Sequence, residues 1–161
     1  IYYEIIRQKT ASLIASCCAV GASSANASPD WIGKMKKFGE CVGMAFQIKD
    51  DLFDYGDDEI GKPVGIDIKE KKMTLPLIYS LSKASWLEKR KIIGIVKNNS
   101  EDANKIKQVI EFVKKSGGID YANQKMTDYY KQAMTILEEL PASEYKTSLA
   151  DLVQFTIERR N

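Results

Sequence analysis

The chain has 161 residues, and its 44% hydrophobic and 29% charged content excludes disordered and collagen-like proteins. Its net charge of +2 gives no electrostatic basis for binding nucleic acid or a membrane surface, and no run approaches the ~18 apolar residues of a transmembrane helix. It has no histidine, which excludes Ser-His-Asp triads, Cys-His pairs and histidine-based zinc or di-iron sites, so any chemistry falls to carboxylates, lysines, hydroxyls or a hard metal ion.

Apolar residues recur at helical spacing along most of the chain, whereas no segment shows the sustained alternation of a β-strand. Ser28 followed by Pro29 is typical of a helix start, and Ser85 followed by Glu88 fits a capping box. We therefore predict an all-α fold in which residues 1–161 form a single unit. Helices are expected near residues 1–24, 29–55, 74–84, 86–97, 101–115, 119–139 and 143–159.

One long irregular stretch, residues 56–72, interrupts the helical pattern. It places glycines and a proline among charged residues, and irregular stretches longer than about 12 residues are usually functional or disordered. The charges are segregated, because acids come before or at its start and lysines follow. The acids are Asp50, Asp51, Asp54, Asp57, Asp58 and Glu59, and the lysines are Lys62, Lys69, Lys71 and Lys72.

Three of these acids form a stripe at the end of the predicted second helix. At about 100° per residue, Asp50, Asp51 and Asp54 share an arc of about 100° with Gln47. Like charges on one face repel, and acids near a helix C-terminus oppose the helix dipole, so a cation would stabilise the arrangement. Mg²⁺ suits it, because this ion commonly joins one or two carboxylates to substrate phosphates. A solvated acidic face is the alternative at this point.

Lysines form the second half of the pattern. Lys9 lies among apolar residues of the first predicted helix with Thr10 beside it, and Lys62 and Lys72 follow the carboxylates. Lys9 alone could snorkel to the surface, and the other two could be solvated loop charges. Carboxylates that hold Mg²⁺ together with lysines that neutralise phosphate suggest diphosphate chemistry.

Four motifs in order carry a resemblance. They are Lys9-Thr10-Ala11, Phe46-Gln47-x-x-Asp50-Asp51-x-x-Asp54, Gly61-Lys62-x-x-Gly65-x-Asp67 and Lys72-x-Thr74-Leu75-Pro76. This series resembles the trans-prenyltransferase (polyprenyl diphosphate synthase) family, and the run Thr74-Leu75-Pro76-Leu77-Ile78 looks most like its medium- and long-chain members. The resemblance implies an antiparallel helical bundle of the isoprenoid synthase type. Beyond residue 80 the resemblance rests on helical character alone.

The resemblance also implies a reaction and its residues. The family uses Mg²⁺ to condense an allylic diphosphate with isopentenyl diphosphate, which gives a linear polyprenyl diphosphate. By resemblance, the metal site comprises Asp50, Asp51 and Asp54, with Asp50 the most direct ligand and Asp67 a supporting acid. Diphosphate contacts fall to Lys9, Lys62 and Lys72, and the polar residues near the developing carbocation are Thr10 and Gln47.

One part of the family pattern is missing. Members carry two aspartate-rich motifs, and this sequence has no second D-D-x-x-D, so residues 1–161 look like the C-terminal portion of the family domain. We therefore expect the chain alone to be inactive. The resemblance implies that the complete protein is a homodimer, as family members usually are. The alternative is a non-catalytic regulatory subunit of a heteromeric synthase. A terpene cyclase fits less well, because its second motif usually has a different pattern.

Two smaller features complete the prediction. Cys17, Cys18 and Cys41 form no C-x-x-C pair, which favours small apolar residues in a reducing, cytoplasmic compartment. The basic pair Arg159 and Arg160 precedes Asn161, the last residue, and its role stays open: some relatives bring a C-terminal arginine toward the site, and an exposed basic helix end is the alternative.

Overall fold

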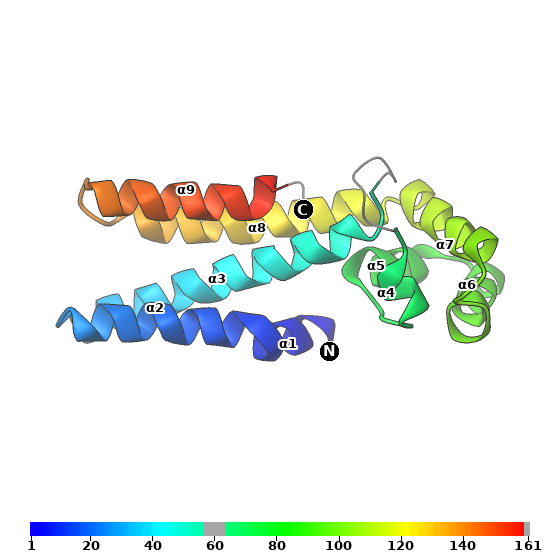
Figure 1. Cartoon of the computed structure of the whole chain (residues 1–161), viewed down its shortest axis with the longest axis horizontal. Helices are drawn as coiled ribbons and strands as arrows, with labels where there is room; N and C mark the ends of the chain where they lie inside the picture. The colour runs from blue at the N-terminus through cyan, green and yellow to red at the C-terminus, as the bar shows by residue number, and fades with distance from the viewer. Residues whose placement is uncertain (57–63, 160–161) are drawn as a thin grey trace. The chain divides into compact units, whose positions relative to one another are not determined.

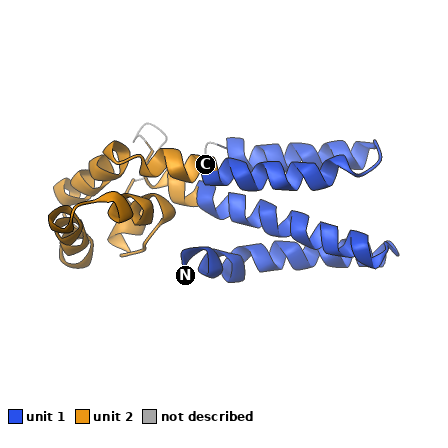
Figure 2. Cartoon of the chain, turned by 180° about the vertical axis from the view of Figure 1, so that it is seen from behind, with its two compact units in different colours: residues 1–49, 125–160 blue, residues 50–124, 161 orange. Residues whose placement is uncertain are grey.

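The computed structural model describes residues 1–56 and 64–159, which divide into two compact units. Unit 1 comprises residues 1–49 and the described chain from residue 125 onward, and unit 2 comprises residues 50–124 (Figure 2). Every regular element in these ranges is a helix, which confirms the predicted all-α fold. Among the described helices, none has the length and apolar character that a bilayer crossing requires. That residues 1–161 act as a single unit stays a prediction.

Unit 1 is built from long helices joined into hairpins (Figure 1). Residues 25–28 join the first helical segment to α3, and residues 139–143 join α8 to α9. Helices α3 and α8 each continue into unit 2. The elements are α1 (Tyr2–Ile6), the π-helix η1 (Arg7–Ala11), α2 (Ser12–Ser24), α3 (Pro29–Phe53), α8 (Gly118–Glu138) and α9 (Glu144–Glu158).

A compact apolar cluster holds α3, α8 and α9 together. Its buried members are Phe38, Cys41, Val42, Ala133, Leu137 and Val153. Polar contacts surround it: Tyr130 on α8 donates a hydrogen bond of 2.6 Å to Gln154 on α9. Because the cluster takes residues from three helices, the apolar face of α3 that the sequence pattern predicts is the face that packs in unit 1.

Unit 2 consists of shorter helices with their own core. Its elements are α4 (Ile66–Lys69), α5 (Leu75–Lys83), α6 (Trp86–Asn98) and α7 (Ala103–Lys115), with the end of α3 and the start of α8. The predicted capping box at the start of α6 is present, because Ser85 and Glu88 bond each other's backbone N–H groups. The core contains Tyr55, Ile68, Leu77, Leu81, Ile92, Ile95, Val96, Ile106, Val109 and Val113.

The predicted helices are all observed, with ends that differ by at most two residues. One difference affects a predicted site residue. Helix α3 ends at Phe53 rather than at residue 55, so Asp54 lies in the turn that follows the helix. Helix α4 was not predicted, because four residues are too few for a periodic apolar pattern to emerge.

Two glycines let α3 approach the first helical segment unusually closely. A Cβ atom on Gly43 would lie 2.5 Å from the Cα of Ala11, and one on Gly39 would lie 2.7 Å from the carbonyl oxygen of Ile14. Ala11 and Ala15, which face these glycines, are fully or almost fully buried. Small residues on both helices therefore fix the spacing of this helix pair, and Ala11 is the last residue of η1.

We predict that Gly43→Ala destabilises the protein, whereas Gly33→Ala on the same helix does not. The new methyl group at position 43 would meet the backbone of Ala11, at a cost of ~1–3 kcal/mol in the free energy of unfolding. A Cβ at Gly33 meets nothing within 4 Å, so the better helix propensity of alanine should stabilise by up to about 1 kcal/mol. Urea unfolding followed by circular dichroism measures both changes, and equal effects would contradict the close-packing argument.

Candidate functional site

The residues that the sequence singled out fall into two groups, one in each unit. Lys9, Thr10 and Gln47 belong to unit 1, and the aspartates with Lys72 belong to unit 2. Helix α3 carries members of both groups, because Gln47 lies three and four residues before Asp50 and Asp51. The prediction for Lys62 lies outside the described residues.

In unit 1, the hydroxyl of Thr10 donates a hydrogen bond to the side-chain carbonyl of Gln47. Thr10 lies in the π-helix η1, and π turns inside α-helices occur frequently at functional sites. Gln47 is only 9% exposed, so its amide is held in a largely dry environment. The close contact of Gly43 with Ala11 brings these two polar side chains within hydrogen-bonding distance of each other.

Lys9 has a different environment from its neighbour. It is exposed, and its side chain makes no hydrogen bond or ion pair with any residue in the described ranges. Because no carboxylate neutralises it there, its ammonium group is available to an anion. This position is compatible with the predicted phosphate contact of Lys9. It is equally compatible with the alternative, a lysine that snorkels to the surface.

The carboxylate of Asp54 accepts a hydrogen bond from the backbone of α4. It is 7% exposed, and its Oδ1 accepts the backbone N–H of Asp67 at 3.0 Å. Burial raises the pKa of Asp54, and the Asp67 N–H partly offsets this effect because it favours the charged form. The second oxygen, Oδ2, is buried without a hydrogen-bond partner among the described residues.

Asp51 is also engaged by a later part of unit 2. Its Oδ2 accepts the backbone N–H of Leu75, the first residue of α5, at 3.0 Å. Next to this bond, the hydroxyl groups of Tyr55 and Thr74 share a buried hydrogen bond. Burial raises the pKa of Tyr55, so the phenol stays neutral and can hold this bond across the physiological range. Asp50, in the last turn of α3, is partly exposed.

Asp67, the predicted supporting acid, and Lys72, a predicted diphosphate contact, form an ion pair. The ammonium of Lys72 lies 3.1 Å from an oxygen of Asp67 and 2.5 Å from one of Glu70. These two carboxylates raise the pKa of Lys72, with Glu70 the larger cause. In this state Lys72 is neutralised by the protein, so a phosphate would have to compete with both acids.

The backbone explains why Lys72 folds back onto Asp67. Lys71 has a φ of +58°, the left-handed conformation that commonly ends a helix. The N–H of Lys72 donates to the carbonyl of Asp67 at 2.8 Å, and the N–H of Lys71 donates to that of Ile68 at 3.0 Å, which together form a Schellman motif. A tight turn therefore reverses the chain at the end of α4.

The motif glycine Gly65 has a structural reason for its identity. Its φ is +81°, and a Cβ atom there would lie 2.4 Å from a methyl group of Ile106 on α7. Any larger residue would be strained and would also collide with the unit 2 core. Gly65 thus lets the chain pass close to α7 at the start of α4.

The aspartates at and just after the end of α3 do not form a complete set of ligands for a divalent metal ion. Among the described residues, no three acidic or cysteine side chains converge to hold a metal ion by themselves. Mg²⁺ in diphosphate chemistry needs only one or two carboxylates, because phosphate oxygens and water complete its octahedron. The partly exposed Asp50 and the buried oxygen of Asp54 that lacks a hydrogen-bond donor are compatible with such a shared ion.

Arg159, whose role the sequence left open, packs on the helix that carries Gln47. Its guanidinium lies 4.1 Å from the ring centre of Phe46, a cation–π contact within unit 1. Burial lowers the pKa of the adjacent Lys49, and the charge of Arg159 lowers it further. Arg159 is therefore not a freely exposed helix end, whereas Arg160 lies outside the described residues.

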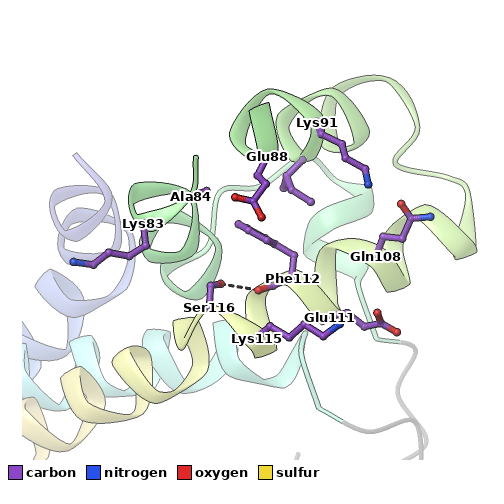
Figure 3. A pocket seen from close by; sticks show the side chains of 10 residues that line it. Lys83, Ala84, Glu88, Lys91, Gln108, Glu111, Phe112, Lys115 and Ser116 are labelled. Carbon is purple, nitrogen blue, oxygen red and sulfur yellow. Dashed lines mark hydrogen bonds between the residues drawn. The ribbon is translucent and has the colours of Figure 1, made fainter. Parts of the chain in front are cut away.

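Unit 2 also contains a pocket of about 480 Å³ that the sequence did not predict (Figure 3). Ile92 and Phe112 line it, and Lys83, Lys91 and Lys115 contribute exposed charges. Glu88, on the same wall, is already bonded to Ser85 in the capping box. The pocket holds none of the motif residues and no buried polar side chain without a partner, so its chemistry is weaker than that of the aspartate-rich helix end.

Comparison with known proteins identifies the family of this chain. A family model described as polyprenyl synthetase matches residues 1–113. The chain belongs to the polyprenyl synthetase family. This confirms the resemblance that the four motifs carry, and the isoprenoid synthase fold with it.

Individual members of the polyprenyl synthetase family align along nearly the whole chain. A short chain isoprenyl diphosphate synthase of Methanothermobacter thermautotrophicus is 38% identical over 162 positions, which cover 99% of this chain and 49% of that protein. Heptaprenyl diphosphate synthase component 2 of Geobacillus stearothermophilus is 33% identical and covers 96% and 48%. Geranylgeranyl pyrophosphate synthase of Corynebacterium glutamicum, solved with calcium and isoprenyl diphosphate, has a TM-score of 0.86 at 37% identity, covering 98% and 49%.

The polyprenyl synthetase chain thus spans about half the length of the curated relatives that it matches. Those relatives include a short chain synthase and a heptaprenyl synthase component, so membership of the family does not fix a product length. The family match ends at residue 113, whereas the relatives align beyond it. The later helices therefore belong to the same relationship, although the sequence motifs end near residue 76.

We predict that Thr10→Val destabilises this polyprenyl synthetase chain by ~1–3 kcal/mol, because the buried carbonyl of Gln47 loses its hydroxyl donor. Valine has nearly the shape of threonine, so packing changes little. Thr10→Ser, the matched control, keeps the hydroxyl and loses only a methyl group. Chemical denaturation gives the two free energies of unfolding. If Thr10→Val were as stable as Thr10→Ser, the hydrogen bond would not be what holds Gln47.

Proposed function

We propose that this chain is part of a prenyltransferase that condenses isopentenyl diphosphate with an allylic diphosphate to give a linear polyprenyl diphosphate. The observation that carries the proposal is the aspartate-rich end of α3, with Asp50, Asp51 and Asp54, in a chain of the polyprenyl synthetase family. The portion described here would supply the second aspartate-rich motif, which holds Mg²⁺ against the allylic diphosphate. Product length is not part of the proposal.

Each site residue receives a proposed role from the residue types and the family motif. Asp50 is the most direct ligand for Mg²⁺, because it is partly exposed in the last turn of α3. Lys9 neutralises diphosphate charge from η1, and Lys72 does so when it leaves its contacts with Asp67 and Glu70. For Lys62, the family motif is the basis for proposing a diphosphate contact. Bound Mg²⁺ would supply charge neutralisation for the departing diphosphate.

The proposed chemistry matches the residues that the chain has. Ionisation of an allylic diphosphate separates a cation from an anionic leaving group, so the main task of the protein is electrostatic stabilisation. Lysines and carboxylate-bound metal perform this task without histidine. The bonded pair Thr10 and Gln47 presents polar oxygen atoms in a largely dry setting, where they would favour a nearby carbocation. We propose that the proton lost after condensation passes to the diphosphate.

The rest of the domain is part of the proposal. Helix α2 exposes Leu13 and Val20, which are 68% and 67% exposed and lie two turns apart on one face. Exposed apolar faces usually mark a contact surface. We propose that the other half of the family domain packs here and supplies the first aspartate-rich motif. The complete protein is proposed to be a homodimer in the cytoplasm, and the three free cysteines agree with a reducing compartment.

A regulatory subunit is the second candidate. One relative is named as component 2 of a heptaprenyl diphosphate synthase, so proteins of this kind occur in assemblies with more than one component. A non-catalytic subunit would have no need to keep Lys9 together with Asp50, Asp51 and Asp54. The retained residues favour the catalytic role.

We predict that Asp50→Ala in the complete enzyme lowers kcat by about 10²–10³-fold and leaves the melting temperature nearly unchanged. The partly exposed carboxylate contributes to charge stabilisation more than to packing. Asp151→Ala, which removes an exposed carboxylate on α9, is the control and should leave kcat unchanged. Steady-state assays with labelled isopentenyl diphosphate measure both variants. An Asp50→Ala enzyme with normal turnover would refute the assigned role.

We also predict that residues 1–161 alone do not catalyse condensation, because they contain one D-D-x-x-D motif and the proposed reaction uses two. Purified chain, Mg²⁺, an allylic diphosphate and labelled isopentenyl diphosphate should give no extractable product above background. The same assay on the protein with both aspartate-rich motifs is the positive control. Product formation by the chain alone would contradict the prediction.

A further inference from the structure

Two of the three aspartates in the aspartate-rich motif each place an oxygen at the start of a later helix. Asp54 bonds the second residue of α4, and Asp51 bonds the first residue of α5. Helix N-termini carry backbone N–H groups that have no partner within the helix and a positive partial charge. A carboxylate oxygen is well suited to accept a hydrogen bond at such a position.

Helix α4 has no capping side chain of its own. The residue before it is Gly65, which has no side chain to act as an acceptor. Its positive φ disfavours any residue that could supply one. Asp54 fills this role from earlier in the chain. Its Oδ1 accepts the Asp67 N–H at 3.0 Å, and its main-chain carbonyl accepts the Gly65 N–H at 3.1 Å. The side chain and the backbone of one residue thus fix the start of α4.

Helix α5 lacks a local cap for a different reason. Thr74 precedes it and would ordinarily cap it, but its side chain makes no cap bond and is held by the hydroxyl of Tyr55 instead. The second residue of the helix, Pro76, has no N–H to cap. The N–H of Leu75 is therefore the first that needs an acceptor, and Oδ2 of Asp51 provides it at 3.0 Å.

We propose that Asp51 and Asp54 are positioning residues, which act as N-caps from a distance and fasten the starts of α5 and α4 to the end of α3. Each uses one carboxylate oxygen for this purpose, so the three aspartates of the motif are not equivalent. The segment from the capped amide of Asp67 to that of Leu75 includes the turn at Lys71 and then Lys72, which pairs with Asp67. The capping role rests on geometry alone, whereas its use in presenting Lys72 to a diphosphate rests on the proposed function.

Amide hydrogen exchange tests this role without substrate or metal. The whole chain is measured in a buffer that contains EDTA, with alanine and asparagine variants of Asp51 and of Asp54. We expect Asp51→Ala to accelerate exchange of the Leu75 amide by about tenfold and to leave the Asp67 amide nearly unchanged. We expect Asp54→Ala to give the reverse pattern. Asp50→Ala, in the same motif, should change neither amide.

The asparagine variants separate capping from charge. Asparagine keeps an oxygen acceptor and removes the negative charge, so Asp51→Asn and Asp54→Asn should restore most of the protection that alanine loses. If an alanine variant does not fold, the asparagine profile decides. Asparagine variants as unprotected as alanine variants, or alanine variants with unchanged exchange at these two amides, would overturn the proposal.

The outcome is independent of the prenyltransferase proposal. Protected amides that depend on Asp51 and Asp54 would support capping even if Asp50→Ala left turnover intact. Loss of turnover in Asp50→Ala with unchanged exchange in every variant would support the catalytic proposal and overturn the capping role.

Discussion

The architecture of unit 2 depends on two backbone N–H groups that find their acceptors far away in the sequence. The amides of Asp67 and Leu75 lie in the first turns of α4 and α5, and they are satisfied by Asp54, just after the end of α3, and by Asp51, in its last turn. A buried N–H without an acceptor costs more than an ordinary hydrogen bond contributes, so such bonds constrain the fold strongly. The buried pair of Tyr55 and Thr74 adds a third tie in the same region. The segment after α3 is thus held at three points.

The sequence pattern predicts that these acids need a cation to relieve their repulsion, but Asp51 and Asp54 already accept backbone hydrogen bonds. The helix starts at α4 and α5 bring positive partial charge to Asp54 and Asp51, which lowers the local cost of gathering carboxylates. Lys72 is likewise balanced by Asp67 and Glu70. The charge pattern of this region is therefore a balanced structural network as well as a candidate site, and a ligand would have to rearrange part of it.

Much of this arrangement follows from the sequence, because the helices are long and strongly periodic. The apolar face of α3, the capping box at Ser85 and the turn residues gave helix ends accurate to two residues. The resemblance implied that Thr10 and Gln47 lie near the same carbocation, but neither it nor periodicity predicted their hydrogen bond, since 37 residues separate them. The roles of Asp51 and Asp54 were not predictable. A helical wheel treats the aspartates as one stripe, whereas their partners are backbone groups that no residue pattern records.

The π-helix at residues 7–11 has a consequence for how this chain can vary. A π turn holds one residue more than the α-helical turn that it replaces, so the side chains before it are rotated by about 100° relative to an uninterrupted helix. Deleting a single residue there would restore a regular α-helix and redirect either α1 or the face that carries Lys9 and Thr10. The number of residues in this turn, rather than their identity alone, therefore sets which way the polar pair faces.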